Sequence, residues 1–240
     1  MTNRFSVIGN IYKQGIKIDE EKGVAKFSVA VSPGKDKEAQ WYNLTYFLKK
    51  DDEGKFIAED KVLEDLKSIK NLEDSAKQPQ LKLNGYLSYN ESENDYGEKT
   101  TYTNLIVNDM KINKDFEIPK AMVKLEGVIH KELATKTQAS IDNNTGKETS
   151  KEFSYLTIKT ADKDGNYEKF HFVGTTNKEQ SQVLEKSNLN DQISIEARLS
   201  PKGKIKITKE CPISITKENG EKITNKSNSK AHSKDTGVEK

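Results

Sequence analysis

Two large aromatic side chains, Trp41 and Phe47, stand six residues apart in a stretch that also holds Asn43 and Thr45. The run from 40 to 50 is rich in aromatic and β-branched residues, which is typical of a strand. Because side chains alternate between the two faces of a strand, these four residues share one face. The other face holds Tyr42, Leu44, Tyr46 and Leu48. Aromatic rings beside polar groups on a solvated face can stack on a planar ligand group. Exposed aromatics also mark contacts with a loop or another subunit.

The elements that must position this strand follow from the order of patterns in the first half of the chain. Alternating residues predict strands over 5–12, 24–31, 81–87 and 100–110, and apolar residues at helical spacing predict a helix over 59–73. Three strands, a helix and two strands, in that order, predict a five-stranded barrel of the OB-fold type. Its second and third strands, with the flanking loops, bind oligonucleotides or oligosaccharides.

The same order recurs in the second half. Residues 123–129 mirror residues 5–11, and a polar loop over 141–151 precedes a hairpin of strands over 153–160 and 167–174. A helix over 178–186 and strands over 193–199 and 204–209 complete the copy. The sequence therefore predicts an all-β protein with one short helix per domain and two tandem OB-fold barrels. We expect domains at 1–114 and 120–215 and a disordered polar tail at 216–240.

On the hairpin of the second copy, alternation predicts a solvated face with aromatic and polar side chains. That face is expected to hold Phe153, Tyr155, Thr157, Lys159, Tyr167, Lys169 and His171. The core face is expected to hold Leu156, Ile158, Phe170 and Phe172.

Composition limits the remaining function classes. The net charge is +2, so a nucleic-acid site has to come from local clustering of basic residues. Cys211 is the single cysteine, which suits a reducing compartment. Neither a signal peptide nor a membrane-spanning run is recognisable, so we expect a cytoplasmic protein.

An enzyme is disfavoured. The three histidines have no spacing typical of a metal site, and Cys211 has no evident base partner. Glycine-rich phosphate loops are absent from the sequence. We therefore expect no catalytic residue, metal or cofactor.

The first copy resembles the OB domain of the bacterial single-stranded DNA-binding protein (SSB) family. The resemblance lies in Arg4-Phe-Ser-Val-Ile-Gly-Asn-Ile11, Ala25-Lys-Phe-Ser-Val-Ala-Val31, Trp41-Tyr-Asn-Leu-Thr-Tyr-Phe47, Leu83-Asn-Gly-Tyr-Leu87 and Tyr102-Thr-Asn-Leu-Ile-Val107. Two departures stand out: Lys35 and Glu91 occupy positions where the family has stacking aromatics, with Tyr89 two residues before Glu91. The family's acidic, aromatic-ended C-terminal tip is missing too, since this tail ends Thr-Gly-Val-Glu-Lys. The resemblance is to a divergent member, of the kind carried by plasmids or phages.

The resemblance implies binding of single-stranded DNA, or of RNA, without sequence preference and without catalysis. Stacking is expected on Trp41 and Phe47, with Tyr86, Tyr89, Phe153, Tyr155, Tyr167 and His171 as further contacts and Asn43 and Thr45 between them. Phosphates are expected at Lys13, Lys17, Lys26, Lys49, Lys82 and Lys159. A homodimer is implied by the resemblance alone. The alternatives are an OB-fold module that binds proteins or oligosaccharides, and an accessory factor of plasmid transfer that has lost or altered DNA binding.

Overall fold

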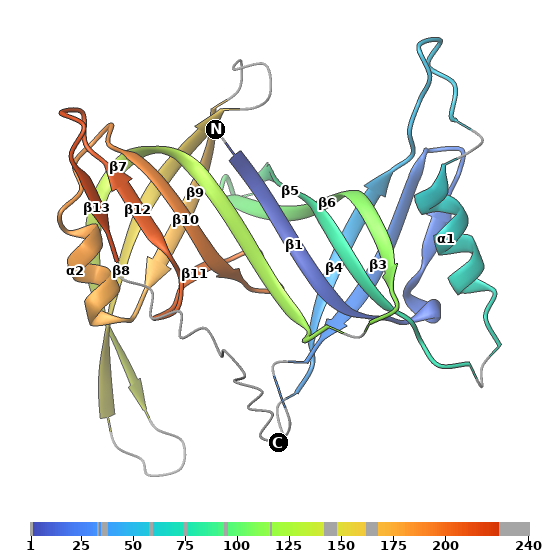
Figure 1. Cartoon of the computed structure of the whole chain (residues 1–240), viewed down its shortest axis with the longest axis horizontal. Helices are drawn as coiled ribbons and strands as arrows, with labels where there is room; N and C mark the ends of the chain where they lie inside the picture. Colours follow the sequence, from blue (N-terminus) through green and yellow to red (C-terminus); the bar gives the residue numbers. More distant parts are fainter. Residues whose placement is uncertain are drawn as a thin grey trace, which may run out of the picture.

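The computed structural model describes residues 2–32, 34, 38–57, 60–73, 76–93, 96–115, 117–141, 148–161 and 168–225. It is mostly β, with two OB-like barrels side by side and short helices at opposite ends (Figure 1). The first barrel contains β1 (Thr2–Ile11), η1 (Lys13–Gly15), β2 (Lys17–Asp19), β3 (Val24–Val31), β4 (Gln40–Phe47), α1 (Lys61–Lys70), β5 (Gln80–Glu93) and β6 (Lys99–Asn113). The second contains β7 (Lys120–Ile141), β8 (Glu148–Ala161), β9 (Glu168–Thr175), α2 (Lys178–Leu184), β10 (Gln192–Leu199), β11 (Ile205–Ile207), β12 (Ile213–Thr216) and β13 (Lys222–Thr224). The predicted fold class is confirmed.

Each barrel closes in the way the sequence order predicts. In the first, β3 pairs with β4, β5 lies between β1 and β6, and the parallel pair β4–β6 completes the ring. In the second, β8 pairs with β9, β10 pairs with β7, and the parallel pair β9–β11 completes it. Alternating apolar side chains fill the interiors, and one cluster of buried residues runs through both barrels.

Several predicted boundaries in the second half are wrong. β7 runs to Ile141 and β8 begins at Glu148, so the hairpin is longer and its connection shorter than the loop expected over 141–151. After β11, which was expected to be the last strand, the chain forms β12 and β13. β13 lies in the segment expected to be disordered. It pairs with β12, and Ile223 packs against the core. Residues 226–240 of the predicted tail lie outside the described part.

The barrels are joined by a ladder between β1 and β7, in which Thr2–Ile8 pair antiparallel with Lys120–Glu126. Phe5 stands opposite Val123 at the middle of this ladder. Together with β5 and β10 on its outer sides, the ladder forms one continuous sheet across the molecule (Figure 1). The two barrels therefore share backbone hydrogen bonds as well as a core.

Two glycines stand at the same place in the two barrels. A Cβ on Gly9 would lie 2.5 Å from the carbonyl oxygen of Ala30, and one on Gly127 would lie 2.2 Å from that of Lys159. The absence of a side chain allows β1 to cross β3, and β7 to cross β8, at short range.

Candidate functional site

The outer face of β3 and β4 carries the aromatic group that the sequence predicts. Trp41 and Phe47 are 47% and 55% exposed, while Tyr42, Leu44 and Tyr46 between them are buried. Asn43 lies on the same outer face, where its Oδ1 accepts a 2.7 Å hydrogen bond from the Ser28 hydroxyl. We call Tyr12, Lys17, Lys26, Trp41, Asn43, Thr45 and Phe47 the barrel-1 patch.

Tyr12 was not among the predicted site residues. It follows β1, is exposed, and places its ring 4.9 Å from that of Trp41 at an interplanar angle of 54°. The two rings form a tilted pair with solvent on its outer side. Such a pair can take a flat group by stacking.

Basic side chains lie beside the aromatic rings of the barrel-1 patch. Lys17 stands opposite Lys26 in the ladder between β2 and β3, and Lys26 stands opposite Thr45. Lys17 and Lys26 are exposed, as is Lys49 just after β4. Two like charges side by side repel each other, and an anion between them relieves that repulsion.

The other two predicted lysines of this half are engaged within the protein. The Lys13 Nζ donates to the carbonyl oxygen of Leu72 at 2.5 Å. Lys82 forms an ion pair with Glu117 at 3.1 Å.

A buried carboxylate anchors the strand beneath the barrel-1 patch. Asp60 caps α1 by accepting from the backbone N–H of Val62 and Leu63, and it accepts from the Tyr46 hydroxyl at 2.6 Å. Burial would raise the pKa of Asp60, but these hydrogen bonds hold it below its usual value. Burial, then Asp60 itself, raises the pKa of Tyr46 well above its usual range. The hydroxyl therefore remains a donor, and β4 is tied to α1 one residue before Phe47.

In the second barrel the expected orientation of β9 is wrong. His171 is fully buried, whereas Phe170 and Phe172 are 41% and 66% exposed. The His171 ring nitrogens lie 2.8 Å from the Thr160 hydroxyl and 2.7 Å from the Tyr89 hydroxyl of the first barrel. Two partners satisfy the imidazole inside the protein, and the two phenylalanines turn outward in consequence. His171 is therefore removed from the candidate contacts.

Two exposed rings of the second barrel, His130 and Phe170, occupy the places of Tyr12 and Trp41 in the first. In the ladders, Asn10 pairs with Ala30 and Val128 with Lys159. Ala30 pairs with Trp41, and Lys159 with Phe170. Phe170 is thus the counterpart of Trp41. By the same count along β1 and β7, His130 is the counterpart of Tyr12.

The counterparts also agree in geometry. The His130 and Phe170 rings lie 4.6 Å apart at 50°, close to the 4.9 Å and 54° of Tyr12 and Trp41. We call these two the ring pairs. Phe172 stands where the first barrel has Asn43, since Thr157 pairs with Phe172 as Ser28 pairs with Asn43. The second barrel therefore repeats the ring pair with one further exposed ring beside it.

The remaining predicted residues divide between the outer face of β8 and β9 and the boundary between the barrels. Tyr155 and Lys159 face the same side as Phe172 and Phe170, and Tyr155 stacks on Phe153 with ring centroids 6.2 Å apart. Tyr86 is half-buried beneath the Lys169 ammonium, 5.1 Å from its ring centroid, across the boundary between the barrels. Tyr89 is committed to His171, and burial raises its pKa well above the usual value. Tyr167 lies outside the described residues.

Sequence reasoning missed Tyr12, His130, Phe170 and Phe172. For Tyr12 and His130 the signal in the sequence is the match between residues 5–11 and 123–129. It aligns Gly9 with Gly127, and three residues later Tyr12 with His130. Two exposed tyrosines of the β5–β6 hairpin, Tyr96 and Tyr102, were missed as well.

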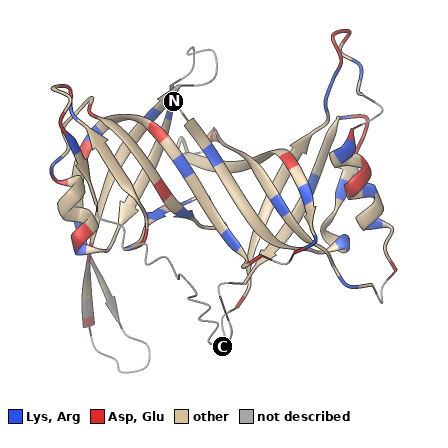
Figure 2. Cartoon of the chain, viewed as in Figure 1, with Lys and Arg blue, Asp and Glu red and all other residues tan. Residues whose placement is uncertain are grey.

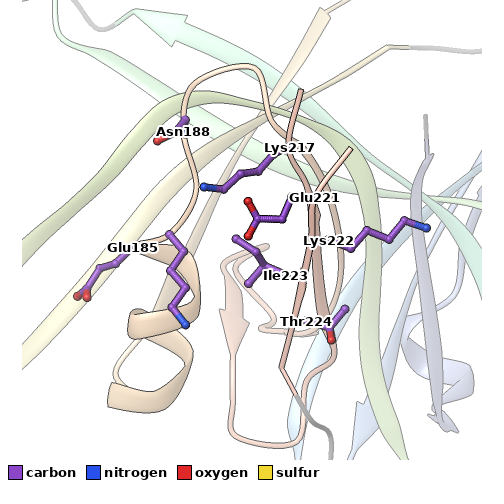
Figure 3. A pocket seen from close by; sticks show the side chains of 8 residues that line it. Glu185, Asn188, Lys217, Glu221, Lys222, Ile223 and Thr224 are labelled. Carbon is purple, nitrogen blue, oxygen red and sulfur yellow. The ribbon is translucent and has the colours of Figure 1, made fainter. Parts of the chain in front are cut away.

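Charge is spread over both barrels, with basic and acidic side chains interspersed (Figure 2). A cleft of about 630 Å³ lies between α2 and the β12–β13 hairpin (Figure 3). Glu185 and Glu221 line it together with Lys186, Lys217 and Lys222, so its charges nearly balance and no ligand class is favoured. Within the described ranges, no group of three or more His, Cys, Asp or Glu is placed to hold a metal ion. Over the same ranges, none of the helices has the length and apolar character needed to cross a membrane.

No protein-family model matches the chain, and no curated protein does. Its fold is similar to that of the single-stranded DNA binding protein from Thermus aquaticus, with a TM-score of 0.52 at 13% identity over 83% of this chain and 85% of that one. A deletion mutant of the same protein gives a TM-score of 0.51 at 13% identity, with 83% and 86% covered. A mitochondrial single-stranded DNA binding protein from S. cerevisiae matches 48% of this chain and all of its own, at 19% identity and a TM-score of 0.33. The likeness to the Thermus protein extends over both barrels, and it is a likeness of fold.

Proposed function

We propose that this protein binds single-stranded DNA without sequence preference and without catalysis, through one aromatic surface on each barrel. The observation that carries the proposal is the repeated ring pair, Tyr12 with Trp41 and His130 with Phe170, exposed at equivalent places. The fold shared with the Thermus protein supports it, since that protein is named for the same ligand. Residues 1–114 and 120–215 would each supply one binding surface.

Stacking would provide most of the affinity. Each base that stacks on a ring contributes roughly 1–3 kcal/mol, and any base will serve because each has a π-face. Lys17 and Lys26 would hold phosphates beside the first ring pair, and Lys159 beside the second. Counterion release would make this part of the affinity fall as salt rises.

In the cell, such a protein would protect single strands in replication, recombination or plasmid transfer, in the cytoplasm. A homodimer and an origin on a mobile element remain part of this proposal through the SSB resemblance. We propose DNA in preference to RNA on the same ground.

Replacement of exposed rings tests the proposal. Trp41→Ala should weaken binding of labelled oligo-dT by roughly 5- to 150-fold, equivalent to the loss of about 1–3 kcal/mol of one stacked base. Fluorescence anisotropy of the labelled strand measures the change, and duplex of equal length should bind far more weakly than the single strand. Quenching of Trp41 in the unmodified protein reports contact at this ring directly.

Ile118→Ala is the matched control, because Ile118 is a large apolar side chain that is 84% exposed and lies between β6 and β7, outside the strands that carry the rings. It should bind oligo-dT as the unmodified protein does. If oligo-dT neither quenches Trp41 nor binds by anisotropy at low salt, the proposal is wrong, and a protein or oligosaccharide ligand becomes the candidate.

A further inference from the structure

The two barrels are related by an approximate two-fold axis, and the pairing register locates it. Phe5 of β1 and Val123 of β7 are counterparts in the two barrels and are also paired with each other. Val7 pairs with Ala121, and their counterparts, Leu125 and Asn3, are paired in turn. A contact that is repeated with its partners exchanged is the mark of an isologous, two-fold interface. The axis therefore passes beside Phe5 and Val123.

Side chains also cross the boundary from counterpart positions, although their partners are not counterparts of each other. The Tyr42 hydroxyl, next to Trp41, donates to the carbonyl oxygen of Leu199 in the second barrel at 2.6 Å. His171 is the counterpart of Tyr42; it lies next to Phe170 and bonds Tyr89 in the first barrel at 2.7 Å. Each ring-bearing strand is thus tied to the opposite barrel by the inward residue beside its exposed ring. The two ring pairs are held in a fixed relation.

This symmetry has a consequence for a ligand with direction. Rotation by 180° about the two-fold axis moves a strand bound at one ring pair to the other ring pair, where it has the same 5′ to 3′ direction relative to the local side chains. Consider one strand that contacts both ring pairs along a symmetric route, that is, a path which the two-fold rotation maps onto itself. The rotation exchanges the 5′ and 3′ ends of this strand. Such a strand would run 5′ to 3′ through one site and, relative to the local side chains, 3′ to 5′ through the other. One uniform strand cannot make identical contacts at both sites along the symmetric route.

We propose that the two ring pairs accept antiparallel single-stranded segments, supplied by two strands or by one strand that folds back between the sites. This inference rests on the proposed function and specifies its ligand. Bound along the symmetric route, a strand of single polarity makes the full contacts at one ring pair only. Engagement of both pairs by one uniform strand requires additional nucleotides for the turn.

Oligo-dT with a polarity inversion tests this directly. Three ligands of equal length are compared: a uniform strand, one with a central 3′–3′ linkage and one with a central 5′–5′ linkage. Lengths from about 8 to about 32 nucleotides cover twice the range of site sizes of a single OB-fold. Affinity is measured by anisotropy and contact at the first ring pair by Trp41 quenching.

One of the two inverted ligands should reach its tightest binding at a shorter length than the uniform strand. At that length its dissociation constant should be lower by about tenfold or more, because the second contact becomes intramolecular. Phe170→Ala should abolish this advantage, and Ile118→Ala should retain it. Circular dichroism checks that both variants are folded.

The inference is overturned if the uniform strand binds at least as tightly as both inverted ligands at every length. It is also overturned if the advantage persists in Phe170→Ala, since the second site would then lie elsewhere. Either result leaves single-strand binding intact. Absence of binding by all three ligands would instead refute the proposed function.

Discussion

His171 lies between two exposed rings, Phe170 and Phe172, while its own side chain is buried against Tyr89 and Thr160. Burial, with a smaller contribution from the positive charge of Lys169, lowers the pKa of His171 from 6.5 to about 4. The imidazole is therefore neutral in the folded protein at neutral pH. In the unfolded chain it takes up a proton near its ordinary pKa.

This difference predicts a pH dependence of stability. Because the unfolded state binds the proton more readily, the contribution of His171 is complete above about pH 6.5 and is lost as the pH falls toward 4. The lowered pKa corresponds to about 3 kcal/mol over that window. Urea unfolding from pH 7 to pH 4 should therefore show a shallower loss of stability in His171→Gln, whose amide can still bond Tyr89 and Thr160.

Both proteins carry the same carboxylates, so the contribution of these groups to the pH dependence of stability cancels in the comparison. An equal dependence of the free energy of unfolding on pH in the two proteins would contradict the lowered pKa of His171. NMR of the imidazole offers a second measurement, in which the His171 signals should keep the neutral form down to about pH 4.

The outward and inward sides of β4 were predictable from the sequence, but those of β9 were not. In β4 the inward set Tyr42, Leu44 and Tyr46 and the outward set around Asn43 differ clearly in polarity. In β9, the order Phe170-His171-Phe172 fits alternation whether the histidine or the two phenylalanines face inward. Hydrophobicity alone favours the arrangement with the phenylalanines inside. The deciding fact is a hydrogen-bond partner, Tyr89, that lies 82 residues away in the chain. Local alternation carries no information about such a contact.

At the scale of elements, the order of strands and helices was readable because the OB order is itself a pattern. The ends of β7 and β8 were not, because the polar residues over 141–151 look like a loop. Backbone pairing of 137–141 with 148–152 forms the ends of these strands without an apolar face. β13 was missed for a similar reason, since its single apolar anchor is Ile223.

The crossings at Gly9 and Gly127 set where the ring-bearing hairpins lie, and a substitution tests their importance. Gly127→Ala places a Cβ 2.2 Å from the carbonyl oxygen of Lys159, the residue paired with Phe170. Backbone must move to accept it, so we expect a loss of about 1–3 kcal/mol in the free energy of unfolding. The midpoint of urea denaturation measures the loss.

Gly15→Ala is the control, because its new Cβ would meet nothing closer than 3.7 Å and its backbone is not in the left-handed region. Its stability should be unchanged or slightly raised, since alanine restricts the unfolded chain more than glycine does. Equal destabilisation by both substitutions would show that close approach at Gly127 is unimportant.

At the scale of the whole molecule, the chain is built like a two-fold dimer whose subunits have been joined. The β1–β7 ladder, the shared core and the bonds that Tyr42 and His171 make across the boundary hold the halves together. Each half therefore presents an edge strand that requires a partner. In the intact chain that partner is always at hand, and the geometry of the two ring pairs is fixed by it.

This architecture predicts the behaviour of the halves when they are produced separately. The segment 1–114 should form a homodimer in which two β1 strands pair antiparallel around Phe5, the residue beside the axis in the intact chain. The Tyr42 hydroxyl would then reach Leu87 of the second copy, because Leu87 is the counterpart of Leu199. Light scattering and sedimentation should show the dimer. Mixing with the segment 115–225 should yield a one-to-one complex, since only that pairing restores the Tyr89–His171 bond. A folded, monomeric 1–114 at high concentration would show that β1 needs no partner, and that the two-fold relation reflects the linker rather than the strands.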